Sequence, residues 1–177
     1  MEHLISEEYK KQITEYHRSR PWGGAVRGNS MMLNKYMMIS GAKTILDYGA
    51  GRSDLLKEMN AQYPDRTYVI NEYEPGRPEL AGDPPKSDAV VSFDVMEHIE
   101  PNKVDNVIKH IYEKCNMWTY HKICLRAATG AFPGTEQNLH LTIKEGPWWL
   151  EKFSKYFIFL ETLMNTGYVH FLAIPKK

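Results

Sequence analysis

The sequence predicts an α/β fold: a doubly wound, mostly parallel sheet with a C-terminal antiparallel hairpin and an N-terminal helical addition. From Lys43 onward, short apolar segments alternate with amphipathic helical patterns, which is typical of parallel strands joined by crossover helices. Because such crossovers are right-handed, helices cover both faces of the sheet. Near the end of the chain, two apolar segments flank Asn165-Thr166-Gly167, a turn sequence that predicts a hairpin.

Two helices are predicted ahead of the sheet. Apolar side chains recur about one helical turn apart at Ile5, Tyr9, Ile13 and Tyr16. They recur again at Met32, Leu33, Tyr36 and Met37. Arg20-Pro21 ends the first helix, and Gly41 can close the second in the left-handed conformation. We expect one domain, 1–177, in which 1–42 form a helical lid and 43–177 a Rossmann-like core.

The core elements follow in a regular order. Strands are expected at 44–48, 67–72, 89–93 and 121–126, and the hairpin strands at 157–163 and 168–175. Helices are expected at 53–61, after Pro101, and at 148–156. Cys115 falls in a helical pattern and Cys124 in a strand. Neither belongs to a C-x-x-C pair, so we expect two buried thiols and no metal site.

Composition excludes several classes of protein. Lys plus Arg and Asp plus Glu both total 22, and this balance argues against a domain that holds nucleic acid mainly through its phosphates. No apolar stretch reaches the roughly 20 residues that span a bilayer, and the N-terminus does not resemble a signal peptide. We therefore expect a cytoplasmic protein without a membrane partner, and the sequence leaves its oligomeric state open.

The segment after the first strand has the composition of a ligand-binding loop. Gly49 and Gly51 allow a tight turn and a close approach of a ligand, and Ser53 can cap the next helix. A dinucleotide site would need a third glycine where Asp54 stands. The acidic Asp47 instead favours a cationic ligand such as S-adenosylmethionine, which carries a sulfonium and an amino group. An ordinary tight turn between a strand and a helix is the alternative.

A carboxylate follows the second strand. Glu74 lies 23 positions after Gly51, where an acid can accept hydrogen bonds from both hydroxyls of a ribose. Glu72 is the rival if the strand ends early. The alternative is that either glutamate is an ordinary exposed carboxylate.

Three motifs together resemble the class I S-adenosylmethionine-dependent methyltransferases. The segment after the third predicted strand reads Asp94-Val-Met-Glu-His-Ile99, similar to the fourth-strand motif of that family. It follows Leu46-Asp-Tyr-Gly-Ala-Gly51 and Tyr73-Glu-Pro75 in the family's order and near its spacing. The resemblance covers roughly residues 43–127, with a weaker likeness to about residue 157.

The resemblance implies a place for each part of the cofactor. Asp47, Gly49 and Gly51 would surround its methionine part. Glu74 would bind the ribose, and the backbone near Phe93 and Asp94 would line the other side. The sequence departs from the family at Ser53, where many members have a third loop glycine, and in the short stretch from Glu74 to Asp88, which implies a reduced third strand.

Two histidines are candidates for the chemistry. His98, beside Glu97, follows the strand end that should face the sulfonium, and His140 lies in the irregular stretch 130–140. An imidazole suits proton transfer because its ordinary pKa is near 6.5. The alternatives are a structural hydrogen bond for His98 and a surface position for His140.

Other residues could recognise an acceptor. Trp148-Trp149 could form an aromatic wall, although packing of the helix is favoured. The arginines Arg18, Arg20 and Arg27 around Trp22 could bind an acidic or phosphate-bearing substrate, or belong to a solvated loop.

The sequence therefore predicts a methyltransferase that uses S-adenosylmethionine and acts on a small or modest-sized acceptor. A catalytically silent module that binds the cofactor or another protein is the first alternative. A nucleic-acid methyltransferase is a weaker one.

Overall fold

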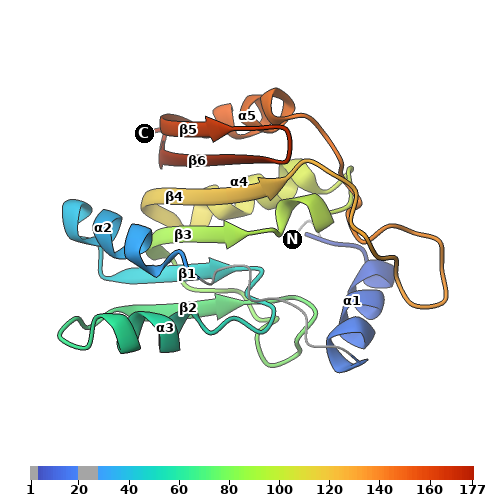
Figure 1. The fold of residues 1–177 in the computed structure, drawn as a ribbon, viewed down its shortest axis with the longest axis horizontal. Coiled ribbons are helices and arrows are strands. Elements are labelled where there is room, and N and C mark those ends of the chain that lie inside the picture. The colour runs from blue at the N-terminus through green and yellow to red at the C-terminus, as the bar shows by residue number, and fades with distance from the viewer. Residues whose placement is uncertain (1–3, 20–27) are drawn as a thin grey trace.

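The computed structural model describes residues 4–19 and 28–177 and has one central sheet with helices on both faces (Figure 1). The strands are β1 (Thr44–Tyr48), β2 (Val69–Tyr73), β3 (Ser87–Phe93), β4 (Cys115–Cys124), β5 (Phe157–Met164) and β6 (Tyr168–Pro175). They form a six-stranded sheet in the order β2-β1-β3-β4-β6-β5. The first four run parallel, and β6 is antiparallel to both of its neighbours. The predicted fold class is confirmed.

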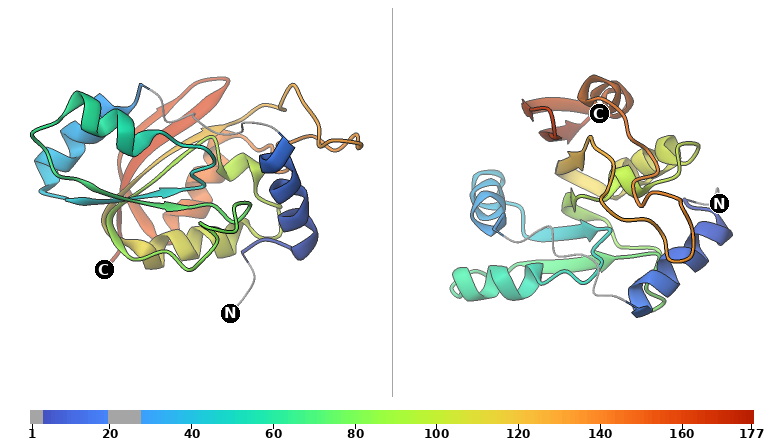
Figure 2. Two further views of the ribbon diagram at one scale, coloured as in Figure 1. Left: turned by 90° about the horizontal axis from the view of Figure 1, so that it is seen from below. Right: turned by 45° about the vertical axis from the view of Figure 1, so that its right-hand side comes forward.

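Alternating side chains along the buried strands divide the core into two layers. The helices are α1 (Glu7–Ser19), α2 (Ser30–Ser40), α3 (Leu55–Gln62), α4 (Val104–Lys114) and α5 (Gly146–Ser154), with the short 3-10 helix η1 (Met96–His98). Ile45 and Val91 pack with α2 and α3, whereas Leu46 and Val90 pack with α4 and α5. Figure 2 shows α2 and α3 on one face of the sheet and α4 on the other. The sheet is therefore doubly wound.

The two predicted N-terminal helices have different positions. The parallel strands end toward α1, whereas α2 lies near their opposite ends (Figure 1). Tyr9 and Ile13 of α1 join the core layer of α4 and α5. In α2, Leu33 and Met37 pack in the layer of α3, and Gly41 ends the helix with a φ of 72°. Only α1 therefore stands at the end of the sheet where ligands bind in such folds.

One predicted boundary is wrong by more than two residues. Cys115 was expected on a helix, but α4 ends at Lys114 and Cys115 is the first residue of β4, with an extended backbone. Its thiol donates a hydrogen bond to the carbonyl of Trp118. Strand β4 thus begins six residues before the expected 121–126, because its pairing with β3 continues back through residues 115–120. Cys124, expected to be buried, is partly exposed at the other end of β4.

The sheet ends at β2 on one side. All of residues 74–86 are described and contain no strand. Hydrogen bonds from the amide of Glu74 to the carbonyl of Leu80, and from Arg77 to Glu74, fold the first part of this segment into turns instead. The expected reduction of the third strand is confirmed, and the sheet has an edge where another strand would otherwise follow.

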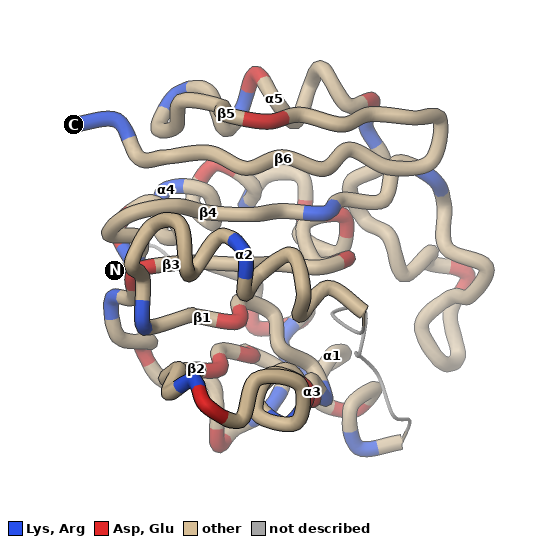
Figure 3. The backbone as a smooth tube through the Cα atoms, turned by 60° about the vertical axis from the view of Figure 1, so that its left-hand side comes forward, with Lys and Arg blue, Asp and Glu red and all other residues tan. Residues whose placement is uncertain are grey.

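Acidic and basic residues are mixed along most of the described chain, although acids predominate between Glu72 and Glu100. Figure 3 shows Lys and Arg interspersed with Asp and Glu along the backbone. Among residues 4–19 and 28–177, no helix is long and apolar enough to cross a membrane.

Candidate functional site

A cavity of about 260 Å³ lies at the carboxyl ends of β1, β2 and β3. Its walls come from the loop after β1, the ends of β2 and β3, the η1 turn and the inner side of α1. Every residue predicted to bind the cofactor lines it, namely Asp47, Gly49, Gly51, Glu74, Phe93 and Asp94. His98 lines it as well, and three side chains of α1, Tyr9, Ile13 and His17, close one side.

The glycine loop follows the backbone path that its sequence predicts. Gly49 has a φ of 77° and Gly51 a φ of 54°, in the left-handed region that favours glycine. The amides of Gly49 and Ala50 both donate to the carbonyl of Tyr73, at 2.8 and 3.0 Å. A side chain at Gly49 would place Cβ 2.4 Å from Cγ1 of Val95. The loop therefore passes directly beneath the segment after β3, where only glycine fits.

Ser53 supports the start of α3 differently from the prediction. Its hydroxyl accepts a hydrogen bond from the amide of Leu55 at 3.1 Å, but the cap position belongs to Asp54, whose side chain makes no capping hydrogen bond. The hydroxyl of Ser53 also hydrogen bonds to Asp47. The residue that stands in place of a third glycine thus helps to hold the acid at the centre of the loop.

Asp47 is a buried carboxylate at the cavity wall. Asp47 is the penultimate residue of β1 and is only 3% exposed. Oδ2 is buried and has no hydrogen-bond partner among the described residues. Burial raises the pKa of Asp47 to about 7, although the hydrogen bond from Ser53 opposes the shift. A buried oxygen of this kind is stabilised by a cation placed in the cavity.

Asp94 provides a second acid on the opposite wall. It has a φ of 54°, the only positive value for a described residue other than glycine. One carboxylate oxygen accepts from Nζ of Lys122 at 2.9 Å, whereas Oδ1 is buried and has no hydrogen-bond partner within residues 4–19 and 28–177. Backbone strain at the end of a strand is typical of functional sites.

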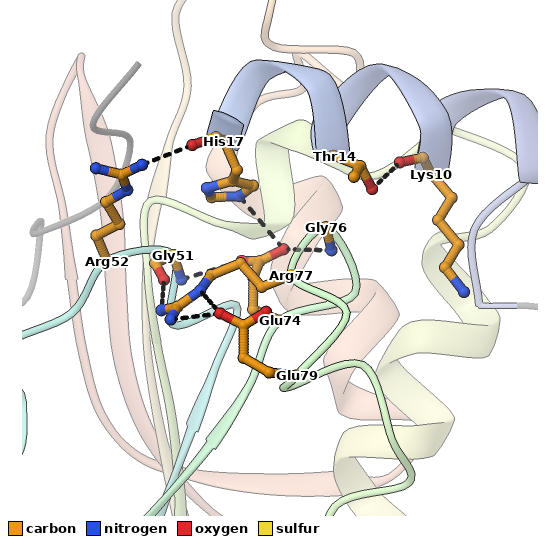
Figure 4. Close-up of polar contacts among 9 residues, drawn as sticks. All are labelled: Lys10, Thr14, His17, Gly51, Arg52, Glu74, Gly76, Arg77 and Glu79. Atoms are coloured by element: carbon orange, nitrogen blue, oxygen red, sulfur yellow. Dashed lines mark hydrogen bonds and ion pairs between the residues drawn. The ribbon is translucent and has the colours of Figure 1, made fainter. Parts of the chain in front are cut away.

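Glu74 lines the cavity, and its carboxylate connects three of the segments around it (Figure 4). Its carboxylate accepts hydrogen bonds from the amides of Gly51 at 3.0 Å and Gly76 at 2.9 Å. Nε2 of His17 on α1 lies 3.5 Å from Oε1. The rival Glu72 lies on β2 opposite Asp47 in the strand register and is not among the residues that line the cavity. Glu74 is therefore the acid that a ligand in this cavity would meet.

Two arginines that the sequence did not single out fix the loop and the helix (Figure 4). Nη1 of Arg77 donates to the carbonyl of Gly51 at 2.7 Å. Nη2 of Arg52 donates to the carbonyl of His17 at 2.8 Å. Their targets are main-chain atoms distant in sequence, so no sequence pattern marks these residues.

His98 and His140 meet beside the cavity. Their rings pack edge to face with centroids 4.7 Å apart, although they come from the η1 turn and from the loop after β4. Nδ1 of His98 hydrogen bonds to the carbonyl of Leu139 at 2.8 Å, and Nδ1 of His140 to that of Arg126. His98 lines the cavity, whereas His140 does not line it and packs against the ring of His98. The structural hydrogen bond weighed for His98 is present, and it orients the ring.

Glu97 completes a three-residue cluster with the histidines. One ligand atom of each side chain lies within 4.8 Å of the others. Oε1 of Glu97 accepts from the amide of Cys124 at 3.1 Å, and Oε2 is buried with no hydrogen bond to the part of the chain that the structure describes. Burial raises the pKa of Glu97 to about 8 and lowers the pKa of His98 to about 4. The imidazole of His98 is therefore neutral near pH 7.

Asn138 shapes the loop that carries His140. Its Oδ1 accepts from the amides of Ala128 and His140, and its Nδ2 donates back to the carbonyl of Ala128. These contacts close residues 128–138 into a loop and fix the backbone of His140. The sequence offered no signal for Asn138 beyond its place in an irregular segment.

The remaining candidates lie elsewhere. Trp149 is fully buried in the core, and Trp148 packs at its margin near Lys144 and Lys152, so neither forms a wall of the cavity. Arg18 is exposed at the end of α1. The predictions for Arg20, Trp22 and Arg27 fall outside the described residues.

The chain has the fold of the class I S-adenosylmethionine-dependent methyltransferases. It is similar to the 1,6-didemethyltoxoflavin-N1-methyltransferase of Burkholderia thailandensis, with a TM-score of 0.64 and 15% identity over 96% of this chain and 90% of that one. That structure contains 1,6-didemethyltoxoflavin and S-adenosylhomocysteine.

Two further solved structures have the same fold. The magnesium protoporphyrin IX methyltransferase of Synechocystis PCC 6803, with bound S-adenosylmethionine, has a TM-score of 0.61 and 10% identity over 96% of this chain and 94% of its own. The N-methyltransferase NodS of Bradyrhizobium japonicum WM9, with S-adenosylhomocysteine, has a TM-score of 0.60 and 12% identity over 96% and 100%. The sequence matches no protein-family profile and no curated protein sequence.

Proposed function

We propose that this protein is a methyltransferase that uses S-adenosylmethionine and acts on a small or modest-sized acceptor. The observation that carries the proposal is the buried, unpaired carboxylate oxygen of Asp47 at a cavity framed by two left-handed glycines. A dinucleotide would bring a pyrophosphate toward this acid, whereas a sulfonium compound with an amino group brings positive charge. The shared fold supports the same choice.

The residues at the cavity fit the parts of this cofactor. Asp47 and the backbone of Gly49 and Gly51 would hold the methionine part, with the amino group near the carboxylate. Glu74 would accept from the ribose hydroxyls, because it lines the cavity directly after β2 and a carboxylate keeps lone pairs beyond those that bind the amides of Gly51 and Gly76. Phe93 and the backbone of Asp94 would line the opposite side. Once bound, the cofactor would supply an electrophilic methyl group to a lone pair of the acceptor; its sulfur would keep the electron pair of the broken bond, and the acceptor would give up a proton.

The cluster of Glu97, His98 and His140 would receive the acceptor. His98 is the member that lines the cavity, and the other two lie within 4.8 Å of it. Each imidazole hydrogen bonds to a carbonyl through Nδ1, an arrangement that places the proton on Nδ1 and the lone pair on Nε2. The cluster can therefore orient an acceptor hydroxyl or amine and deal with the proton that methyl transfer releases.

A small acceptor agrees with the size and charge of the molecule. The described chain contains no substrate domain besides the sheet and its helices, so α1 and the loop at 126–148 shape the space next to the cavity. The similar structures include enzymes whose names specify a toxoflavin precursor and magnesium protoporphyrin IX. No comparable observation on the described residues favours nucleic acid, because acidic and basic residues are mixed along the backbone and acids predominate between Glu72 and Glu100 (Figure 3).

The test is methyl transfer from labelled S-adenosylmethionine to a low-molecular-weight cell extract. The wild type should label at least one compound, and the His140→Asn variant should do so about 100-fold more slowly with unchanged affinity for the cofactor, because His140 does not line the cavity. Binding of the cofactor without labelling of any extract would contradict the proposal and favour a silent module.

A further inference from the structure

We propose that Glu97, His98 and His140 form a binding site for one divalent transition-metal ion beside the cofactor cavity. The metal would hold an oxygen of the acceptor, so that the acceptor carries a hydroxyl or carboxylate group. The position of the ion follows from side chains alone. Its part in catalysis rests on the proposed function.

The three side chains approach the spacing of a metal site before any ion is present. Their nearest ligand atoms, a carboxylate oxygen and two imidazole nitrogens, lie within 4.8 Å of one another. Bonds of about 2.0–2.2 Å to a transition metal leave ligand atoms up to about 4.4 Å apart. Small rotations of the side chains would therefore close the site, and the backbone would not need to move.

Outer contacts already orient both imidazoles. Metal-binding histidines usually donate Nδ1–H to a carbonyl or carboxylate, and the ion then binds Nε2. His98 has this contact with Leu139, and His140 has it with Arg126. Asn138 in addition accepts from the amide of His140 at 2.9 Å.

Glu97 offers an oxygen that the protein leaves unpaired. The residue is fully buried, and Oε1 accepts from the amide of Cys124 at 3.1 Å. Oε2 has no hydrogen bond among the described residues. Its backbone carbonyl accepts from the amide of Thr142 at 2.9 Å, which fixes this turn against the segment that carries His140. An oriented and unpaired buried carboxylate is costly unless a cation binds it.

The charges around the cluster also favour a cation. Asp94 lies three positions before Glu97, and its Oδ1 is likewise buried without a hydrogen bond. Lys122 pairs with the other oxygen of Asp94 at 2.9 Å. Glu97 is fully buried, whereas the side chain of Asp94 is 24% exposed and pairs with one lysine, and a bound divalent ion would favour the ionised form of both acids.

The ligand set selects the kind of ion. Two imidazoles and one carboxylate suit Mn²⁺, Co²⁺ or Zn²⁺ better than Ca²⁺ or Mg²⁺, which prefer oxygen ligands. Three protein ligands leave coordination positions open for water and for an acceptor. A hydroxyl bound there would have a lowered pKa and would release its proton to water. With the ion bound, Nε2 of each histidine would be a metal ligand and would not accept that proton.

The full chain is first stripped of metal with a chelator. It is then titrated with Mn²⁺, monitored by electron paramagnetic resonance, and separately with Zn²⁺, monitored by calorimetry. No S-adenosylmethionine is present. The wild type should bind one ion per chain. His140→Asn and Glu97→Gln should each weaken binding by at least about tenfold. His170→Asn, which removes a partly exposed histidine bonded to Tyr120, is the matched control and should bind normally.

Three results would overturn the inference: no binding by the wild type, equal binding by all four proteins, or loss of binding in His170→Asn. Thermal melting of each variant in the presence of chelator checks that the variant folds. If Glu97→Gln is unstable, His140→Asn still tests the site, because His140 is only partly buried. Binding of S-adenosylmethionine to metal-free wild type is measured separately. Failure of that binding alone would overturn the proposed function and leave the metal site standing.

Discussion

At the scale of single residues, Asp47 defines what the cavity can bind. A carboxylate that is 3% exposed and has an unpaired oxygen is unfavourable when ionised. The fold keeps this acid next to Gly49 and Gly51, where a ligand can approach the backbone. Ionised Asp47 therefore lowers the free energy of unfolding, and a cationic ligand bound beside it would raise that free energy again.

This cost predicts a dependence of stability on pH. The pKa of Asp47 is about 7 in the folded chain and about 3.9 in an unfolded one. The unfolded state thus loses its proton first, and the wild type loses stability as the pH rises from about 4 to about 7. Asp47→Asn removes this loss and should be more stable than the wild type at pH 8, by up to about 4 kcal/mol, but not at pH 4.

Urea denaturation at the two pH values measures the difference. Asp65→Asn, which removes an exposed carboxylate, serves as the control and should match the wild type at both. If Asp47→Asn gains nothing at pH 8, the carboxylate must be solvated in the empty protein, and the electrostatic argument for a cationic ligand is wrong.

At the scale of elements, α1 covers the cavity through close contacts with the turn after β2. A Cβ added to Gly76 would lie 2.7 Å from Cδ2 of His17 and 3.0 Å from Cγ1 of Ile13. Glu74 and Arg52 bond to His17 as well. The helix is thus held by the same residues that shape the glycine loop, and its position should be coupled to binding of the cofactor.

Gly76→Ala tests this coupling with a single methyl group. The alanine should push α1 outward, weaken the affinity for S-adenosylmethionine by about tenfold, equal to about 1.4 kcal/mol, and speed hydrogen exchange of the amides in α1. Gly82→Ala is the matched control, since nothing lies within 4 Å of its added Cβ. Equal affinity and exchange in the two variants would show that α1 does not close the cavity.

At the scale of the whole molecule, the sequence predicts what depends on local pattern. Runs of apolar residues located β1, β3 and β6, and the order of strands and helices identified the doubly wound sheet. Because parallel strands end at one edge, their order also brought Asp47, Glu74 and Asp94 to one cavity. These inferences need only periodicity and topology.

Contacts between distant segments could not be predicted in this way. Arg77 reaches the carbonyl of Gly51, and Asn138 fixes His140 through the backbone of Ala128. Nothing in the local sequence distinguishes these side chains from solvated ones. The start of β4 at Cys115 was missed for the same reason, since pairing with β3 and not local composition extends that strand.

The central claim is that the cavity binds S-adenosylmethionine through Asp47, and calorimetry tests it most directly. The folded wild type should bind one molecule of S-adenosylmethionine or S-adenosylhomocysteine per chain. Asp47→Ala should bind S-adenosylmethionine at least about tenfold more weakly, whereas Gly82→Ala should bind it as the wild type does. Absence of binding to well-folded wild type, or normal affinity in Asp47→Ala, would contradict the claim.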